Sequence, residues 1–348
     1  MTIREKLEED EERVLSRFAQ KSRDSKGRDR PEPPDPVRPI FQHDRDRVIH
    51  SKAFRRLAGK TQVFLAPEGD HYRTRITHTL EVAQIARTVT RALGLNESLT
   101  EAIVMGHDLG HTPFGHAGEK VLAKLMPGGF HHVKQSLRVV EVLENEGQGL
   151  NLSVEVRDGI LKHSKGKGHV ISDNPNLMAM TLEGQIVRIA DIVAYVNHDL
   201  DDAVRGKVVD PASVPDSILA TLGRSHSERI SRMVNDIVSA SNLEEKRQIR
   251  MTDAVLDALI ALRDFLYETV YERPMIRGEF EKAQRIISEL WAYFHAHPDE
   301  FRARHWPKGI PESDGLSRAV GDFITGMTDR YALRVYEEYF LPRRWEVY

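Results

Sequence analysis

The chain has 348 residues, of which 40% are hydrophobic and 30% charged, and its formal net charge is −3. This composition predicts a globular protein of one large domain or two, without the global basic bias that nucleic-acid binding produces. There is no cysteine, so disulfides and thiolate metal sites are excluded.

The N-terminal region is charged and lacks the apolar segment of a secretory signal. Residues 2–20 carry a loose apolar stripe that allows a short amphipathic helix. Residues 21–38 are polar and rich in proline, so we expect a linker or a loop that follows the surface. No apolar run approaches the roughly 18–20 residues that span a bilayer. We therefore expect a cytoplasmic protein with no membrane partner.

From residue 39 onward the apolar residues recur at helical spacing. Asn96 or Ser98 can cap a helix that runs into His107. Strand signals are scarce, with Val170–Ile171 as one short exception, so the predicted fold class is all-α. The other helices are expected over residues 77–93, 115–126, 133–146, 154–163, 181–204, 213–224, 226–241, 244–271, 279–297 and 314–339.

A set of histidines and aspartates lies on these predicted helices. His107 and Asp108 end the apolar helix AIVMGHDLG, and burying such a pair is costly unless the side chains are paired or ligated. Neighbouring side chains on a helix diverge by about 100°, so the pair can grip only one side of an ion. His78 and Asp191 occupy polar positions on otherwise apolar helical faces and can complete the set.

Two imidazoles and two carboxylates suit a divalent ion, and the spacing does not choose among Mn, Mg, Fe, Ni, Co and Zn. Four protein ligands on a six-coordinate ion leave positions for water and substrate. The residues alone also allow a structural interpretation. In it Asp108 caps a turn, and Asp191 forms a core salt bridge with Arg188 or Arg75.

The order H…HD…D resembles the HD superfamily of metal-dependent phosphohydrolases. The surrounding residues are similar to the bacterial deoxyguanosinetriphosphate triphosphohydrolase-like (dNTPase) family of that superfamily, clearly so over residues 39–205. After that only LRDFLYETVY, residues 262–271, is similar. The segments that carry the resemblance are residues 50–64, 70–87, 94–119 and 183–203.

The resemblance implies an HD-domain helical core with a helical C-terminal extension. We divide the chain into a charged N-terminal segment and linker (1–38), an HD catalytic core (39–205) and a helical region packed on that core (206–348). The implied reaction is metal-dependent hydrolysis of a dNTP at the α-phosphorus, giving a deoxynucleoside and inorganic triphosphate. The alternatives are another HD phosphohydrolase, such as a nucleoside monophosphatase or a phosphodiesterase, and a non-catalytic module that binds nucleotides or single-stranded DNA.

The segment HTPFGHAGE follows the His–Asp pair directly. Gly110 and Pro113 should end the helix, which leaves His111 and His116 on or beside a loop over the ion. Glu119 follows His116 by three residues, so on a new helix the carboxylate could fix the tautomer of the imidazole. The alternative is that Glu119 is a first-turn carboxylate favoured by the helix dipole.

The resemblance implies that His116 transfers a proton, that Glu119 orients it, and that His111 and His132 line the phosphate site. The two residues that follow His132, Val133 and Lys134, differ from those of the family at these positions. His131 could therefore take the place of His132, and both could instead be exposed histidines at the start of a helix.

Further residues match family positions that bind substrate. Arg75 lies one turn before His78 and projects toward the metal side. Tyr195 and Asp199 follow Asp191 at i+4 and i+8. The resemblance implies that Asp199 takes the 3′-OH and that Tyr195 excludes a ribose hydroxyl at C2′. The alternatives are a core tyrosine and a solvated helix end.

Position 192 is Ile, where many relatives carry a basic residue. Lys162 is our candidate for a replacement or additional phosphate ligand, although it could equally belong to a solvated loop. Arg56, in a cluster with Arg55 and Lys60, could meet phosphate or face solvent.

Family resemblance also implies a homo-oligomer, often a hexamer, and a nucleotide or single-stranded DNA as a possible effector. Interface helices are expected within residues 225–345. There the aromatic residues are buried or interfacial: Trp291, Tyr293, Phe294 and Trp306. Base preference, native metal and activator are left open by the sequence.

Overall fold

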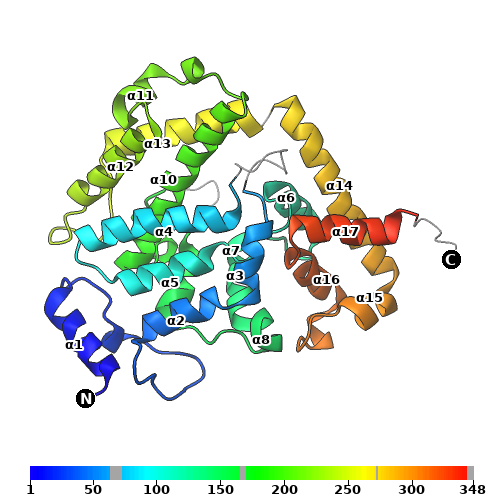
Figure 1. Cartoon of the computed structure of the whole chain (residues 1–348), viewed down its shortest axis with the longest axis horizontal. Coiled ribbons are helices and arrows are strands. Elements are labelled where there is room, and N and C mark those ends of the chain that lie inside the picture. Colours follow the sequence, from blue (N-terminus) through cyan, green and yellow to red (C-terminus); the bar gives the residue numbers. More distant parts are fainter. Residues whose placement is uncertain (63–72, 165–169, 272, 343–348) are drawn as a thin grey trace, which may run out of the picture. The chain divides into compact units, whose positions relative to one another are not determined.

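The computed structural model describes residues 1–62, 73–164, 170–271 and 273–342 (Figure 1). Within these ranges the regular structure is helical, and extended pairing is limited to two isolated bridges, Arg28 with Ser153 and Thr61 with Thr74. Val170 and Ile171 form no strand. The expected all-α fold is therefore confirmed.

The chain forms two compact units, each assembled from segments that are distant in the sequence. Unit 1 consists of Met1–His50, Thr77–His107 and Asn151–Ile276. Unit 2 consists of Ser51–Ile76, Asp108–Leu150 and Arg277–Tyr348. The boundaries expected at residues 38/39 and 205/206 stay predictions.

Unit 1 is built around the apolar helix α5, which contacts α2, α9 and α10 (Figure 1). Ile103 and Val104 are fully buried on it. From Leu99 to His107 every residue of α5 except Glu101 is buried, so this part of the helix lies inside the core of its unit. The helices of unit 1 are α1 (Ile3–Val14), α2 (Ile40–Ile49), α4 (Arg75–Ala92, from Thr77 on), α5 (Glu97–His107), α9 (Val154–Lys162), α10 (Leu182–Arg205), α11 (Asp216–Leu222), α12 (His226–Ala240) and α13 (Asp253–Leu266), which continues as the π-helical turn Tyr267–Tyr271.

Unit 2 combines the middle of the sequence with its C-terminal part around one apolar cluster. Phe114 and Leu122 lie in this cluster beside Phe294 and Val320. Trp291 is buried, while Tyr293 and Trp306 pack against the cluster and are partly exposed. The helices of unit 2 are α3 (Lys52–Arg56), α6 (His116–Leu125), α7 (His132–Arg138), which continues as the π-helical turn Val139–Leu143, α8 (Glu144–Gly147), α14 (Pro274–Ala296, from Arg277 on), α15 (Pro298–His305), α16 (Leu316–Thr325) and α17 (Asp329–Phe340).

Three predicted helices are interrupted. The predicted helix 133–146 ends in a π-turn and in Asn145 and Glu146, whose φ values of 51° and 55° are left-handed. The other two predicted helices are longer than the observed ones. Within 244–271 the helix begins only at Asp253, and the range 314–339 contains two helices that separate at Gly326. In both cases a threonine N-cap begins the helix that follows, a signal that the apolar periodicity hides.

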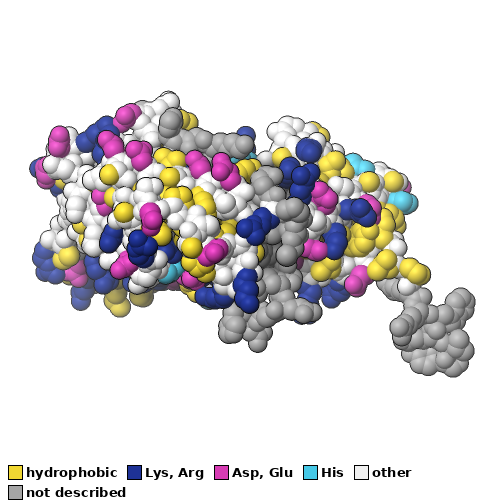
Figure 2. All heavy atoms as spheres, turned by 90° about the horizontal axis from the view of Figure 1, so that it is seen from above, with side chains coloured by type: hydrophobic (Ala, Val, Ile, Leu, Met, Phe, Trp, Pro, Cys, Tyr) yellow, Lys and Arg dark blue, Asp and Glu magenta, His cyan; other side chains and the backbone are white. Residues whose placement is uncertain are grey.

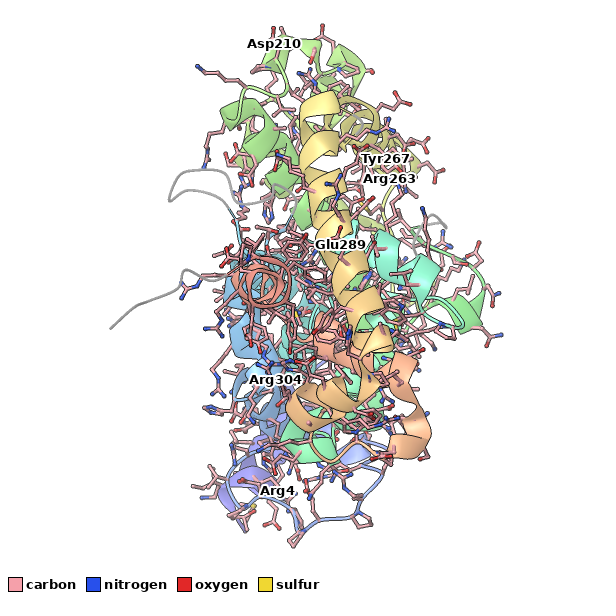
Figure 3. The ribbon with its side chains drawn as sticks, turned by 90° about the vertical axis from the view of Figure 1, so that its right-hand side faces the viewer. Arg4, Asp210, Arg263, Tyr267, Glu289 and Arg304 are labelled. Atoms are coloured by element: carbon pink, nitrogen blue, oxygen red, sulfur yellow. The ribbon has the colours of Figure 1, made fainter. Side chains whose placement is uncertain are left out.

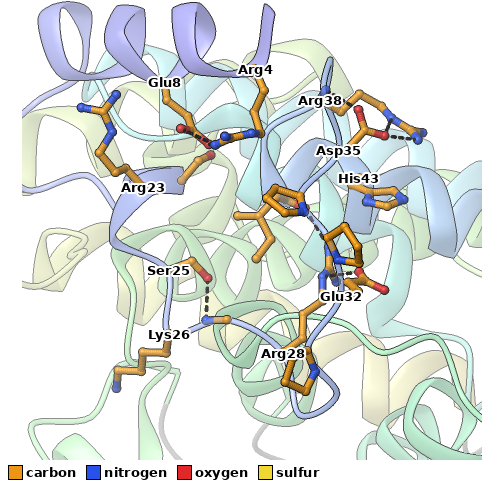
Figure 4. Close-up of a pocket in the computed structure, with 16 residues that line it drawn as sticks. Arg4, Glu8, Arg23, Ser25, Lys26, Arg28, Glu32, Asp35, Arg38 and His43 are labelled. Atoms are coloured by element: carbon orange, nitrogen blue, oxygen red, sulfur yellow. Dashed lines mark hydrogen bonds and ion pairs between the residues drawn. The ribbon is translucent and has the colours of Figure 1, made fainter. Parts of the chain in front are cut away.

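Residues 21–38 follow the surface of unit 1, as the second of the two sequence interpretations expected. Arg28 pairs with Asp44 and donates to the Asn151 carbonyl at 2.6 Å. With α1 and α2 the segment lines a cavity of about 450 Å³ (Figure 4). Much of the charge in this cavity is already paired, for example Arg4 with Glu8 at 2.7 Å.

The charge distribution agrees with the near-neutral composition. On the face that Figure 2 shows, basic and acidic side chains are interspersed with apolar ones. Among the described helices, none combines the length and the apolar character that a membrane span requires.

A buried carboxylate joins three segments of unit 1. Glu183 Oε1 accepts the backbone N–H groups of Gln20 and Asn96, each at 3.0 Å. Its Oε2 is also buried, and no described residue forms a hydrogen bond with it. Burial raises the pKa of Glu183 to about 7. The folded protein therefore holds this proton more tightly than the unfolded chain does.

Glu183→Gln should consequently change the pH dependence of stability. The contribution of protonated Glu183 is fully present below its usual pKa of 4.5 and is lost as pH rises through about 7. The glutamine stays neutral, so above pH 7 the variant should be more stable than the natural chain by on the order of 3 kcal/mol, with little difference at pH 5. Urea unfolding at pH 5 and pH 8 measures this, and an equal difference at both values would contradict it.

Candidate metal and catalytic site

Two histidines and one aspartate converge within unit 1. His78 comes from α4, His107 is the last residue of α5, and Asp191 lies in the middle of α10. Asp191 Oδ1 is 3.0 Å from His78 Nε2 and 3.8 Å from His107 Nε2. Both histidines are buried, whereas the Asp191 side chain is 18% exposed. Three ligand atoms suited to a divalent ion therefore lie together, with one edge open to solvent.

The tautomer of His107 favours ligation. Its Nδ1 is 2.6 Å from the Val104 carbonyl, which can only accept, so Nδ1 carries the proton. The lone pair is then on Nε2, the atom nearest Asp191. Ligand atoms about 2.1 Å from an ion lie roughly 3 Å apart when adjacent. The three residues fit a metal without a large rearrangement.

Asp108 follows His107 directly in the chain and begins a segment of unit 2. Its buried carboxylate accepts from Arg75 Nη1 at 2.9 Å through Oδ2 and lies 3.0 Å from His111 Nε2 through Oδ1. Arg188 donates to the carbonyls of Val170 and Leu177. Arg75 therefore pairs with Asp108, and the alternative of a salt bridge from Asp191 to Arg188 or Arg75 stays a prediction.

A second group of polar side chains lies in unit 2. His111 and His132 stack with their ring centroids 4.1 Å apart. Glu119 Oε1 accepts the His132 backbone N–H at 2.9 Å and lies 3.0 Å from His132 Nδ1. By contrast, Glu119 Oε2 is 4.0 Å from His116 Nδ1. The nearer partner of Glu119 is thus His132, whereas the sequence predicted His116.

The choice between the two adjacent histidines follows from the start of α7. The side chain of His131 accepts from the Val133 backbone N–H at the N-cap. His132 is the first residue of the helix and turns toward Glu119. The substitutions at Val133 and Lys134 therefore do not move His131 into the place of His132.

Burial and charge set the protonation of this group. Burial, followed by the positive charge of Arg75, holds the pKa of His111 well below its usual range. Burial acts to raise the pKa of Glu119, but hydrogen bonding to His132 and its charge hold it below the usual range. Neutral His111 donates from Nε2 to Asp108, and its buried Nδ1 has no hydrogen-bond partner within the part of the chain that the structure describes.

The loop that carries His111 is shaped by close backbone contacts. α5 ends at His107 and α6 begins at His116, so the predicted break between them is confirmed. Gly110 lies against α7, where a Cβ would stand 2.1 Å from the Ser136 nitrogen and 2.5 Å from the His132 carbonyl oxygen. Only glycine allows this approach.

Gly110→Ala should therefore destabilise the protein and displace the loop. Neither contact atom belongs to a flexible side chain, so the backbone must shift, at a cost of about 1–3 kcal/mol. Gly278→Ala on α14 is the matched control, because a Cβ there meets nothing within 4 Å. Chemical denaturation of both variants measures the difference. Equal stability of the two would contradict the close approach.

The predicted substrate residues differ in their surroundings. Tyr195 and Asp199 share a face of α10 with Asp191. Asp199 is 3% exposed, and burial together with the charges of Asp191 and Asp199 raises the pKa of Tyr195. Ile192 is buried with the core. Lys162 pairs with Asp158 at 2.8 Å.

The other two predicted substrate residues lie in unit 2. Arg75 is 2% exposed and is held by Asp108. Arg56 lies on α3 and is exposed. The positions therefore favour Arg75 over Arg56 as a residue held in place for a ligand.

Comparison with known proteins agrees with this geometry. Residues 75–196 match the HD domain, and residues 249–338 match a phosphohydrolase-associated domain. A "Deoxyguanosinetriphosphate triphosphohydrolase-like protein" of Caldanaerobacter subterraneus subsp. tengcongensis is 54% identical, covering 99% of this chain and 98% of the relative. Another of that description, from Desulfatibacillum aliphaticivorans, is 52% identical over 98% of this chain and 99% of the relative. The chain belongs to this HD phosphohydrolase family.

A solved structure of a hypothetical protein from Aquifex aeolicus is more distant. It is 19% identical, with a TM-score of 0.44, and the match covers 85% of this chain and 70% of that one. A likeness this weak does not bear on the function.

Membership in the family adds an associated C-terminal domain to the HD domain. The associated domain includes the predicted motif 262–271, where Arg263 and Tyr267 lie beside each other at the end of α13 (Figure 3). Arg263 donates to Asp264 at 2.7 Å, and Tyr267 is half exposed on the π-helical turn.

Further polar residues of unit 2 adjoin the loop 108–115, and of these only Lys60 was singled out from the sequence, in a basic cluster with Arg55 and Arg56. Lys60 is 2% exposed, and Gln62 has a buried Oε1 without a hydrogen-bond partner among the described residues. Asp329, 215 residues from Phe114, accepts the backbone N–H of that residue. Lys60 and Gln62 lie in the segment 50–64, and its resemblance to the family is the feature of the sequence that pointed to them. Nothing local marks Asp329.

Proposed function

We propose that the chain is a dNTP triphosphohydrolase, which hydrolyses a deoxynucleoside triphosphate at the α-phosphorus to a deoxynucleoside and inorganic triphosphate. The observation that carries the proposal is the convergence of His78 and His107 on Asp191. Asp108, which follows His107 in the chain, opens a segment with four further histidines. The names of the relatives support the choice of substrate.

In this proposal a divalent ion is held by His78, His107, Asp108 and Asp191. Such an ion, when bound, would polarise a phosphate oxygen and lower the pKa of a water molecule. The donor set of imidazole and carboxylate suits several divalent metals equally.

The remaining chemistry falls to side chains of unit 2. Attack of water at the α-phosphorus expels a 5′-oxygen, which needs a proton, and the triphosphate charge needs cations or N–H donors. His116 is exposed at the start of α6 and is proposed to transfer the proton. His111 and His132 are proposed to line the phosphates. Glu119 orients His132 through Nδ1, which leaves Nε2 directed to the substrate.

Binding of the sugar is assigned to α10. Asp199 is proposed to accept the 3′-OH, and Tyr195 to pack against C2′ and leave no room for a ribose hydroxyl. Arg75, already held by Asp108, would contact the nucleotide with its planar guanidinium. Lys162 and Arg56 are proposed as further phosphate contacts, and Lys162 would first have to leave Asp158.

A panel of the four dNTPs, singly and in mixtures, with Mn and Mg compared, tests the proposal. Phosphorus NMR should show inorganic triphosphate as the product. Orthophosphate or pyrophosphate as the first product, or preferential turnover of dNMPs or cyclic nucleotides, would contradict it. The mixtures also test for a nucleotide effector, and sedimentation velocity tests the proposed homo-oligomer.

A further inference from the structure

One carboxylate from the C-terminal helices reaches the loop that carries the catalytic histidines. Asp329 is the first residue of α17. Its Oδ1 accepts the Phe114 backbone N–H at 2.8 Å. Its Oδ2 accepts the backbone N–H of Thr61 at 3.0 Å and the Thr61 hydroxyl at 2.6 Å. Three donors from two segments therefore meet on a single side chain of unit 2.

A buried lysine holds the same loop from another point. Lys60 donates from Nζ to the His111 carbonyl and to the Thr325 carbonyl, the latter at 2.8 Å. Its own carbonyl accepts the Arg75 backbone N–H at 3.0 Å. Burial lowers the pKa of Lys60 to about 7. A neutral amine still has two N–H donors, as many as the two carbonyls require.

The loop needs such support because its backbone is unfavourable. Phe114 has a φ of 60°, in the left-handed region that residues other than glycine seldom occupy, and Gly115 follows at 53°. Such conformations persist only where the surroundings hold them. The Phe114 ring is buried in the apolar cluster of unit 2, so without Asp329 its N–H would lack an acceptor inside the protein.

We infer that Lys60, Thr61, Thr325 and Asp329 form a clamp that positions the loop carrying His111 and leading into His116. Thr325 and Asp329 lie in the phosphohydrolase-associated domain, so this domain serves the HD chemistry by holding the loop. None of the four is proposed to touch substrate, and they act as positioning residues. The catalytic consequence rests on the proposed function, whereas the mechanical consequence does not.

The test compares Asp329→Asn with Asp236→Asn. Asp236 belongs to unit 1 and likewise accepts both donors of one threonine, the Thr252 backbone N–H at 2.9 Å and the Thr252 hydroxyl at 2.7 Å. Hydrogen exchange by mass spectrometry on the full-length protein should show faster exchange of the peptide covering residues 108–116 in Asp329→Asn. The exchange rate of that peptide should be unchanged in Asp236→Asn.

Turnover of dNTP supplies the second measurement. In Asp329→Asn, kcat should fall about 10- to 100-fold, the range seen when a group that orients a catalytic residue is lost. KM and metal content should stay unchanged. Thr61→Val, which removes a single donor, should also speed the exchange of the loop and lower kcat, but by less. It replaces Asp329→Asn if that variant fails to fold.

Unaltered exchange of the loop in both Asp329→Asn and Thr61→Val would overturn the clamp, as would a loss of kcat that Asp236→Asn shares. If the natural chain releases no inorganic triphosphate, the proposed function fails. The exchange measurement still decides the clamp in that case.

Discussion

His107→Ala is expected to abolish both metal binding and hydrolysis. His107 presents Nε2 toward Asp191 with its tautomer set by the Val104 carbonyl, and alanine offers no ligand atom. A bound ion contributes several kcal/mol to transition-state stabilisation in phosphate hydrolysis. Its loss corresponds to a fall on the order of 10³-fold or more in kcat.

Metal content by mass spectrometry and kcat by triphosphate release measure the effect. His305→Ala is the control, because His305 is a partly buried histidine of unit 2 that bonds the Tyr339 hydroxyl at 2.7 Å within the aromatic cluster. It should keep both metal and activity. A His107→Ala protein that retains stoichiometric metal and turns over dNTP would remove the basis of the metal assignment.

Glu119→Gln is expected to lower kcat by about 10- to 100-fold while leaving the metal in place, the range seen when a group that orients a catalytic residue is lost. The carboxylate bonds both the backbone N–H and Nδ1 of His132. The amide keeps a similar shape but loses the charge. An amide nitrogen facing Nδ1 would also reverse the tautomer of His132.

The control is Glu300→Gln, which removes a carboxylate that accepts the Tyr293 hydroxyl at 2.9 Å in the same unit. It should leave kcat unchanged. Single-turnover kinetics separate chemistry from product release. A Glu119→Gln variant with normal single-turnover rates would show that Glu119 is only a first-turn carboxylate of α6, the alternative that the sequence allowed.

Much of the fold could be predicted from local pattern. The apolar spacing predicted α4, α5, α9 and α10 within a few residues, because a buried helical face imposes a period of 3.6 on the sequence. The break after His107 followed from glycine and proline in HDLGHTPFG. The predicted helices 244–271 and 314–339 were longer than the observed ones, because apolar periodicity does not show where a helix is capped.

The site was predictable in part. His78, His107 and Asp191 lie on three helices, and the polar positions on their apolar faces were visible in the sequence. Their convergence in unit 1 came with the structure. The partner of Glu119 was not predictable. Spacing along a helix favoured His116, three residues away, whereas the start of α7 brings His132 closer.

What the sequence determined by itself was helical content, the polar positions on apolar faces and a family resemblance strong enough to name the chemistry. Tertiary structure alone decided which side chains support that chemistry. Phe114 and Asp329 are 215 residues apart, and Lys60 and Thr325 are 265 apart. The local sequence does not predict such pairs, because each of these residues is also common in turns or on surfaces. They become hydrogen-bond partners only when the packing of unit 2 excludes water from both.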